Sequence, residues 1–494
     1  MDKVAGTPRV SSGVRGLDQI LGGGFLPHRL YLAEGRPGTG KTTLALQFLL
    51  EGLRRREKAL YVTLAESKAE IAEVAASHGW SLDALSVFEL VPPEASLDRE
   101  REQTLLHSSE IELTETTQLI FEHVARLEPS RVVCDSLSEL RLLASNPLRY
   151  RRQILAIKHF FTGRRCTVLL LDDSTASRDE QLHSVPYGVI ELEQLAREYG
   201  TERRRLRIAK MRGMTFRGGY HDFVIETGGI TVHPRLAIEH VHSEVGAPMK
   251  SGIPGLDELL GGGLASGTNA LLIGPSGAGK TTLALHYALA AAQSGDHAAI
   301  FSFDEGDATL RARCAGFGID LDGHIGSGHI RLQQIDPAEL SPGEFLHQVR
   351  ESVERDKARV VIIDTLNGYF NAMPEEQFLV LQLHELLSWL NRHGVLTLVV
   401  MAQHGVLGDM RAPMDVSYLS DTVLLLRYFE AGGMVRQAIS VVKKRVGQHE
   451  RAIREFKLAP HGIVIGPPLT DFHGVLTGVP SFSGKPAALM STHE

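Results

Sequence analysis

The sequence predicts an α/β fold of two tandem domains, each with a mainly parallel sheet flanked by helices. Two loops, Gly35–Thr42 and Gly274–Thr281, read G-x-x-x-x-G-K-T, and each follows a short apolar run. Apolar runs then alternate with helical patterns in both halves of the chain. Continuous apolar runs are typical of central parallel strands, which are covered on both faces.

The two halves repeat each other, first at a constant offset and then with a drift, so that Asp364 follows Asp135 by 229 residues. Lys280 follows Lys41 by 239 residues, and Glu305 follows Glu66 by the same number. A period of this length indicates duplicated domains rather than small stacked repeats. We expect an N-terminal domain over 1–240, a C-terminal domain over 241–466 and a flexible, Gly-, Pro-, Ser- and Thr-rich tail over 467–494.

Each half contains four runs that read as buried strands. In the first half they are Leu30–Ala33, Ala59–Leu64, Arg131–Asp135 and Val168–Leu171. In the second half they are Ala270–Ile273, Ala298–Phe303, Val360–Asp364 and Leu396–Met401. A helical pattern follows each glycine-rich loop, so we expect a strand, loop and helix unit at the start of each domain.

Composition agrees with a large cytoplasmic protein. The chain has 494 residues, is 43% hydrophobic and carries a net charge of −7. It has no apolar run of 18 residues and no charged-then-apolar leader, so we expect neither a membrane span nor secretion. The three cysteines form no Cys-x-x-Cys pattern and the 22 histidines show no ligand spacing. We expect buried thiols and surface histidines.

The two glycine-rich loops predict binding of ATP with Mg²⁺. Consecutive backbone N–H groups of such a loop surround the phosphates, and the following helix directs its positive end at them. Lys41 and Lys280 would neutralise the β- and γ-phosphates, while the hydroxyls of Thr42 and Thr281 would bind Mg²⁺. The expected phosphate-binding residues are Gly35, Gly38, Thr39, Gly40, Lys41, Thr42 and Thr43, and Gly274, Gly277, Ala278, Gly279, Lys280, Thr281 and Thr282.

Carboxylates at strand ends complete each predicted site. Asp135 and Asp364 end apolar runs and would orient Mg²⁺-bound water, although an aspartate also commonly ends a strand. Glu66 in the first half, and Asp304 with Glu305 in the second, end the strand after the loop helix. They are candidates to deprotonate or orient the attacking oxygen; the alternative is that they cap the following helix.

These motifs together resemble the KaiC family of tandem RecA-like ATPases. The pattern Ser-Gly-x-x-Gly-Leu-Asp-x-x-Leu-Gly-Gly-Gly precedes both loops, over 12–24 and 251–263, and the resemblance extends from about Val10 to Pro467. It implies two P-loop NTPase domains, a homo-hexameric double ring with ATP at subunit interfaces, and an autokinase in the second ring. It also implies circadian timing or stress signalling, and a KaiB-like partner on the first ring.

The resemblance assigns further residues. Asp304 takes the place of the general base, with Glu305 beside it, whereas Ala65 precedes Glu66 in the first half. A Lys-x-Arg near the end of each repeat, Lys210 with Arg212 and Lys443 with Arg445, would reach the nucleotide of the neighbouring subunit. The alternative is a basic strand edge that discourages aggregation.

The same resemblance places a phospho-acceptor serine at Ser417. Tyr418 stands where the family has a threonine, so a second acceptor would be this tyrosine or would be missing. We favour Ser417 alone. A Ser-Tyr pair before a strand also needs no function at all.

Two other functions use the same core. A DNA-binding recombinase or motor shares this fold, but the net charge of −7 and the pI near 6.3 give no electrostatic signature of nucleic-acid binding. An ATP-gated scaffold with little turnover is the second alternative, because Ala65 and the short Asp304 side chain could leave both sites slow.

Overall fold

The computed structural model describes residues 8–90, 105–144, 146–173, 180–196, 200–236, 245–371, 378–403, 416–431, 433–460, 462–477 and 481–482. The chain separates into two compact units, 1–235 and 236–494. Residues 237–244, which contain the expected boundary at 240, lie outside the described residues. No helix in the described part is long and apolar enough to cross a bilayer.

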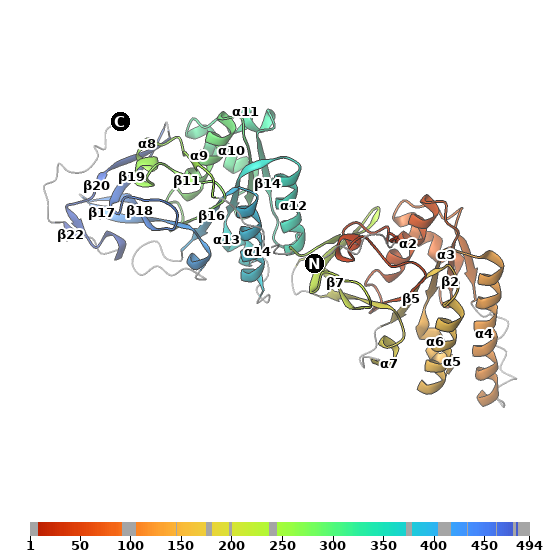
Figure 1. Ribbon diagram of the computed structural model, residues 1–494. Coiled ribbons are helices and arrows are strands. Elements are labelled where there is room, and N and C mark those ends of the chain that lie inside the picture. The colour runs from red at the N-terminus through yellow and green to blue at the C-terminus, as the bar shows by residue number, and fades with distance from the viewer. Residues whose placement is uncertain are drawn as a thin grey trace. The chain divides into compact units, whose positions relative to one another are not determined.

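The first unit is built on a nine-stranded sheet with the order β3-β2-β4-β5-β1-β6-β7-β8-β9 (Figure 1). From β3 through β6 in this order, neighbouring strands pair in parallel. From β6 through β9, neighbouring strands pair antiparallel. The strands are β1 (Leu30–Gly35), β2 (Ala59–Thr63), β3 (Ser86–Glu89), β4 (Arg131–Asp135), β5 (Thr167–Asp173), β6 (Gly188–Leu195), β7 (Arg203–Met211), β8 (Tyr220–Glu226) and β9 (Gly229–His233).

Helices cover both faces of this sheet. Its helices are α1 (Leu17–Ile20), α2 (Lys41–Arg54), α3 (Lys68–Ser77), α4 (Leu105–Leu127), α5 (Leu137–Ala144), α6 (Pro147–Phe161) and α7 (Glu180–His183). Helices α2 and α3 pack on the face that presents Tyr31 and Ala33. Helices α4, α5 and α6 pack on the opposite face, which presents Leu30 and Leu32. Alternate side chains of β1 point to opposite faces of the sheet, so they contribute to two separate cores.

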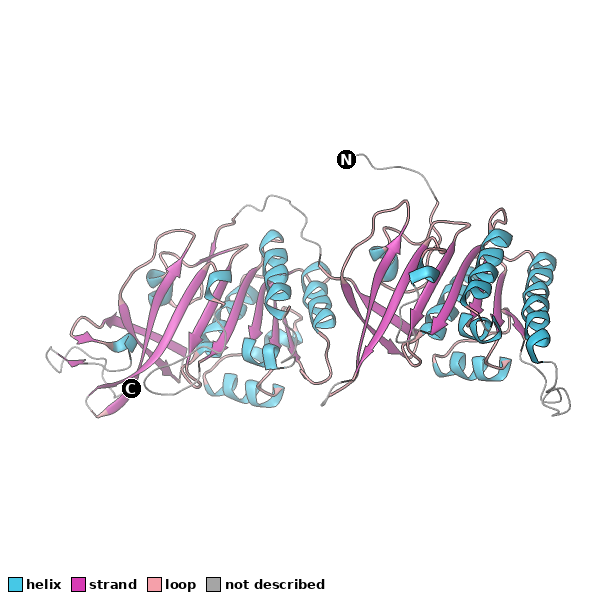
Figure 2. Cartoon of the chain, turned by 90° about the horizontal axis from the view of Figure 1, so that it is seen from below, coloured by secondary structure: helices cyan, strands magenta, loops and turns pink. Residues whose placement is uncertain are grey.

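The second unit repeats this arrangement, with helices against both faces of its sheet (Figure 2). Its large sheet has the order β14-β13-β15-β16-β12-β17-β18-β19-β20. The strands are β10 (Pro248–Met249), β11 (Leu264–Ala265), β12 (Asn269–Gly274), β13 (His297–Ser302), β14 (Ile330–Gln334), β15 (Ala358–Asp364), β16 (Leu396–Ala402), β17 (Thr422–Ala431), β18 (Met434–Lys444), β19 (Ile453–Ala459), β20 (Gly462–Pro468), β21 (Phe472–His473) and β22 (Ser481–Phe482). The helices are α8 (Pro254–Leu259), α9 (Lys280–Gln293), α10 (Asp307–Gly316), α11 (Leu321–Gly326), α12 (Pro342–Glu354), α13 (Leu366–Asn371), α14 (Leu379–Arg392), and the 3₁₀ turns η3 (Ser417–Leu419) and η4 (Val475–Thr477).

The predicted fold class is confirmed, and each expected strand lies within two residues of its predicted bounds. All three cysteines are buried, as expected. The antiparallel strands β7 to β9 and β18 to β20 were not predicted. Their half-exposed faces carry charged side chains, among them Arg204 and Arg205 of β7, so they lack the continuous apolar run that marks a central strand.

The beginning of the expected flexible tail packs against the second domain. Leu469, Phe472 and Val475 are buried, and the Phe472 ring lies 5.4 Å from that of Phe429 on β17. These apolar side chains cover the end of the sheet, which gives the segment a fixed place. Residues 478–480 and 483–494 lie outside the described part of the chain.

A glycine ends each phosphate loop because no side chain fits there. Gly279 precedes α9 with a φ of 94°, and a Cβ atom at this position would lie 2.7 Å from Cε1 of Phe456. Gly40 precedes α2 with a φ of 95° and would meet Ile225 at 2.6 Å. The antiparallel half of each sheet thus closes against the loop, which can bend sharply enough to receive phosphates only with glycine.

Gly279→Ala should destabilise the second domain by about 2–4 kcal/mol, because a left-handed alanine costs about 1–2 kcal/mol and the clash adds more. Gly295→Ala is the matched control, since Gly295 has a φ of 85° and open space around its Cβ position. It should cost only about 1–2 kcal/mol. Urea unfolding measures both variants, and equal losses would contradict a role for the Phe456 contact.

Candidate nucleotide sites

Both phosphate loops lie at the carboxyl end of the central strand of their sheet. The first joins β1 to α2 and the second joins β12 to α9. Strands β4 and β5, which are parallel to β1, end at the same edge of the first sheet, and β15 and β16 do so in the second. This edge is where ligands bind in open parallel sheets.

The two loop lysines are buried and fold back onto their own loops. Lys41 Nζ donates to the carbonyl oxygens of Gly35 at 2.8 Å and Arg36 at 3.1 Å. Lys280 Nζ donates to those of Gly274 at 2.9 Å and Pro275 at 2.6 Å. Burial lowers the pKa of Lys280 to about 8, and the nearby Asp364 opposes that shift. An anion placed over either loop would meet an ammonium group already in position.

Each predicted metal-binding threonine lies beside the predicted aspartate. Thr42 Oγ1 is 3.5 Å from Asp135 Oδ2, and Thr281 hydrogen-bonds to Asp364. Burial raises the pKa of Asp135, and it raises the pKa of Asp364 to about 6. Asp135 also accepts a hydrogen bond from the hydroxyl of Tyr61 on β2, and this bond opposes the shift.

The donor set in the second domain suits a bound cation. Asp364 is 5% exposed, and its Oδ1 atom has no hydrogen-bond partner in the described structure. An unpaired buried carboxylate oxygen is costly, and Mg²⁺ prefers carboxylate, hydroxyl and water oxygens. The residues present therefore fit Mg²⁺ with a nucleotide.

A pocket of about 350 Å³ lies over the second phosphate loop. The loop region, the strand-ending carboxylates and five other positions form its wall: Ser276, Gly277, Gly279, Lys280, Thr281, Thr282, Asp304, Glu305, Arg313, Phe317, Asp364, Thr365, Ala402 and Leu458. The predicted base, metal ligands and phosphate loop of this domain are thus brought together in one cavity.

The candidate bases have different surroundings in the two domains. Burial, followed by repulsion from Asp135, raises the pKa of Glu66, and its Oε2 atom is buried without a partner in the described structure. Asp304 is exposed and accepts a hydrogen bond from Thr365. Glu305 forms an ion pair of 2.7 Å with Arg313 on α10. Glu66 is therefore more basic than an ordinary glutamate. Glu305 is instead paired with a cation.

The structure adds one carboxylate to the first site that sequence reasoning missed. Asp173, at the end of β5, lies 2.9 Å from Lys41 Nζ. The equivalent position on β16 is Ala402, because Gly35 pairs with Asp173 and Gly274 pairs with Ala402. The only signal in the sequence was a second aspartate after the apolar run 168–171. Sequence reasoning also missed Tyr61, Arg313 and Thr365. Each of them approaches the site from an element other than the phosphate loop.

The Lys-x-Arg pairs lie at the other end of the sheets. Val423 pairs with both Leu271 and Lys443, so Lys443 lies near the start of β12 and the phosphate loop near its end. Lys443 Nζ donates to the carbonyl oxygen of Ser417 at 2.9 Å, and Arg445 donates to that of Tyr418 at 2.9 Å. Neither the basic pair nor the expected phospho-acceptor approaches the phosphate loop of its own domain.

The first domain has the same arrangement. Lys210 donates to the carbonyl oxygens of His183 and Pro186, the latter at 3.0 Å, and Arg212 donates to that of Ser184 at 2.9 Å. His183 and Ser184 thus occupy the positions of Ser417 and Tyr418. In each domain the Lys-x-Arg pair thus binds the segment that precedes a parallel strand next to the central strand. This strand is β6 in the first domain and β17 in the second.

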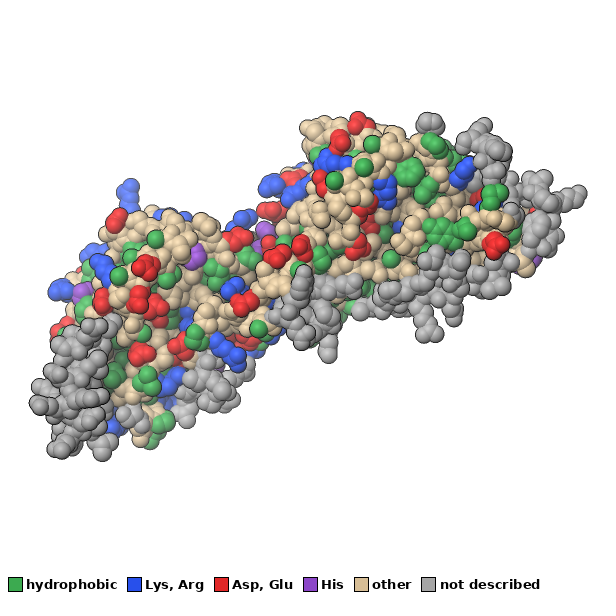
Figure 3. Space-filling model, turned by 180° about the vertical axis from the view of Figure 1, so that it is seen from behind, with side chains coloured by type: hydrophobic (Ala, Val, Ile, Leu, Met, Phe, Trp, Pro, Cys, Tyr) green, Lys and Arg blue, Asp and Glu red, His purple; other side chains and the backbone are tan. Residues whose placement is uncertain are grey.

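On the face seen in Figure 3, blue and red side chains alternate over both units and form no large patch of one sign. This distribution agrees with the acidic net charge and offers no extended basic stripe on that face for a nucleic-acid backbone.

Comparison with known proteins assigns both halves of the chain to one family. The family model described as "ATPase: KaiC" matches residues 10–237 and again residues 249–470. The "Circadian clock oscillator protein KaiC" of Acaryochloris marina is 27% identical over 484 residues, covering 96% of this chain and 91% of the relative. The "Circadian clock protein KaiC3" of Synechocystis is 26% identical over 497 residues, with 97% and 96% covered.

The second site should bind Mg²⁺ and ATP best between about pH 6 and about pH 8. Below this window Asp364 gains a proton and ceases to be a metal ligand, and above it Lys280 loses one. Nucleotide titrations across pH in a Lys41→Ala background measure this domain alone. Asp364→Asn should remove the acidic limb only, and a profile without either limb would contradict the assignment.

Asp173→Asn should tighten ATP binding to the first domain by up to about fivefold. The carboxylate competes with phosphate for Lys41 and repels it, but Asp173 is 39% exposed, so the pair is worth at most about 1 kcal/mol. Fluorescent ATP titration in a Lys280→Ala background isolates this site. Weaker binding in the variant would show that the carboxylate serves the nucleotide instead.

Proposed function

This chain belongs to the KaiC family of ATPases, and from that premise we propose that both domains bind ATP with Mg²⁺ and hydrolyse it, and that the second domain phosphorylates Ser417 of a neighbouring subunit. The matching family model covers both repeats. By relation to the clock proteins, we propose a role in circadian timing or a related signalling process.

The placement of the acceptor segment carries this proposal. Thr422 pairs with Ala270 near the start of β12, and Ser417 precedes that pair, while the phosphate loop begins at Gly274. The four residue-to-residue steps along the strand from Ala270 to Gly274 span about 13 Å. The side chains of Ser417 and Arg445 are thus at the wrong end of the domain for their own nucleotide. Transfer to Ser417 would require the site of another subunit.

A ring meets this requirement because it places the amino edge of one sheet against the carboxyl edge of the next. In a head-to-tail assembly each subunit would donate Lys443 and Arg445 to the neighbouring site, and Lys210 and Arg212 in the first domain. A guanidinium at the transferring phosphate stabilises its charge. We propose a homo-hexameric double ring in the cytoplasm, with a KaiB-like partner on the first ring.

Roles follow for the residues of the second site. Asp304 would accept the proton of the Ser417 hydroxyl as its oxygen forms a bond to the γ-phosphorus and the bond to ADP breaks. Lys280 would hold the phosphates, and Thr281 with Asp364 would hold Mg²⁺, which supplies neutralising charge there. Arg313 would keep Glu305 oriented beside the base, given their ion pair of 2.7 Å.

In the first domain Glu66 would orient or deprotonate the attacking water. Its raised pKa makes it a better proton acceptor than an ordinary carboxylate, and Asp135 lies close enough to contribute to that shift. Thr42 and Asp135 would hold the metal, and Lys41 the phosphates. Ala65 leaves this site with one carboxylate where the second has two.

The autokinase is tested by mass spectrometry of the purified chain after incubation with Mg²⁺-ATP. Phosphate is expected on Ser417 of the wild type and absent from Ser417→Ala. Asp304→Asn should slow its appearance by about 10²–10⁴-fold, the usual contribution of a general base. Tyr418→Phe is the matched control and should keep the phosphate on Ser417.

Transfer between subunits is tested by mixing two inactive variants. Lys280→Ala keeps the acceptor but loses the second phosphate site, whereas Ser417→Ala keeps the site but loses the acceptor. Mixed assemblies should carry phosphate on Ser417 of the Lys280→Ala chains. ATP consumption with no phosphate on any chain would refute the kinase and favour an ATP-gated scaffold.

A further inference from the structure

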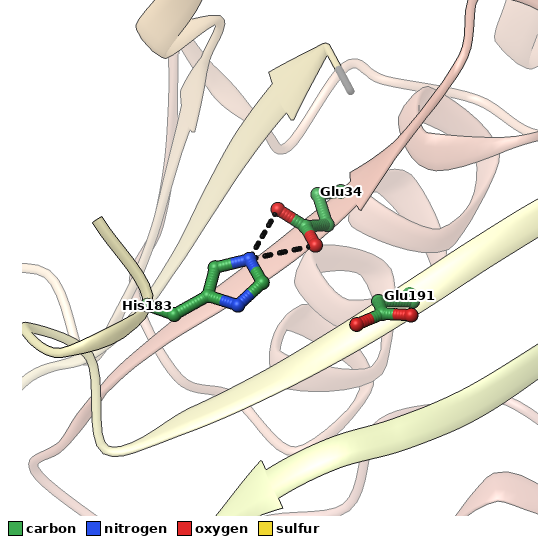
Figure 4. Close-up of side chains that lie close together, drawn as sticks. All are labelled: Glu34, His183 and Glu191. Atoms are coloured by element: carbon green, nitrogen blue, oxygen red, sulfur yellow. Dashed lines mark hydrogen bonds and ion pairs between the residues drawn. The ribbon is translucent and has the colours of Figure 1, made fainter. Parts of the chain in front are cut away.

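A second group of titratable side chains lies in the first domain, outside the nucleotide site. Glu34 on β1, Glu191 on β6 and His183 at the end of α7 point toward one another (Figure 4). One ligand atom of each lies within 4.8 Å of the other two. His183 Nε2 is 2.8 Å from both carboxylate oxygens of Glu34.

These carboxylates belong to a charged row that crosses four strands. Glu34 pairs with Asp172 of β5 on one side and with Glu191 of β6 on the other, and Glu191 pairs with Arg207 of β7. Directly opposed side chains are about 4.5–5.5 Å apart at Cβ. The row lies on the face that presents Leu32 to α4, α5 and α6, opposite the face covered by α2.

The second domain has apolar side chains at the three matching central positions. Ile273 takes the place of Glu34, and it pairs with Met401 and Leu425, which replace Asp172 and Glu191. Apolar side chains at these three positions are what the centre of a parallel sheet requires. The fold therefore does not require the charged side chains at these positions of the first domain. Their burial needs another explanation.

The carboxylates of this row have basic partners but retain one unsatisfied oxygen in the described structure. Arg141 pairs with Asp172, Arg207 lies 2.5 Å from Glu191, and His183 lies 2.8 Å from Glu34. Asp172 is 2% exposed and its Oδ1 atom has no hydrogen-bond partner in the described structure. Buried carboxylates are normally paired or bound to a metal.

We propose that Glu34, His183 and Glu191 bind a divalent transition-metal ion, with Zn²⁺ the best match. Imidazole nitrogen and carboxylate oxygen are both zinc ligands, and three protein ligands leave a fourth position open. The imidazole nitrogen disfavours Mg²⁺ and Ca²⁺, which take oxygen ligands. Arg207 hydrogen-bonds to Glu191 and would orient this ligand, as outer partners do in metal centres.

The ion would tie α7 to the two central strands. His183 ends α7, and the carbonyl oxygens of His183, Ser184 and Pro186 hold the basic pair Lys210 and Arg212. Metal binding would thereby fix the segment that positions these two side chains. The site would bind metal without nucleotide, since Glu34 lies on the sheet face away from α2.

The test uses the full chain, from which bound metal is removed with a chelator. The protein is then kept without nucleotide in a buffer that contains excess Mg²⁺. Co²⁺ titration followed by visible absorption should give one strongly bound ion per chain with bands of a nitrogen and oxygen ligand set, and Zn²⁺ should displace it. Thermal unfolding should shift upward with either ion. Absence of a stoichiometric ion in the wild type would overturn the proposal.

Three variants locate the ion. Glu34→Gln, His183→Gln and Glu191→Gln should each weaken Co²⁺ binding by more than about tenfold, since even outer partners contribute 10–100-fold. His347→Gln is the matched control, because His347 faces one carboxylate, Glu351, at 3.7 Å on a helix of the second domain. Unchanged Co²⁺ spectra and affinity in the three variants would place the ion elsewhere and refute the site.

Discussion

The polarity of the central parallel strand is the constraint on which both domains depend. Side chains and loops at its carboxyl end form the candidate phosphate site, whereas the segments that lead into the parallel strands lie at its amino end. In the second domain this rule separates Lys280 from Ser417 and Arg445. The distance follows from the rise of a strand and is independent of side-chain detail. The proposed joint action of Ser417 and Lys280 therefore involves more than one chain.

The two domains share a backbone plan but differ in their buried charges. Asp173 pairs with Lys41, whereas Ala402 leaves Lys280 without a carboxylate at that position. Asp135 accepts a hydrogen bond from Tyr61, while the Oδ1 atom of Asp364 is unsatisfied in the described structure. A duplicated fold thus contains two electrostatically distinct sites. In the first, Lys41 is paired with a carboxylate, whereas the second has a carboxylate and an ammonium with strongly shifted pKa values.

Much of each nucleotide site was predictable because its parts are contiguous or end recognisable strands. The loop around Lys41 is one short segment, and Asp135 ends a run of apolar residues. Arg313 and Thr365 were not predictable, since each reaches a carboxylate from a different element. The metal-binding group was also hidden: 149 residues separate Glu34 from His183, and no ligand spacing marks them.

The sequence by itself determined the duplication, the α/β class, the central strands and the two phosphate loops. These are local patterns, set by the periodicity of apolar residues and by the backbone freedom of glycine. Only the tertiary structure decided which strands are neighbours, and hence that Glu34 lies between Asp172 and Glu191. Register between strands far apart in the chain depends on the packing of the whole sheet, which no local pattern records.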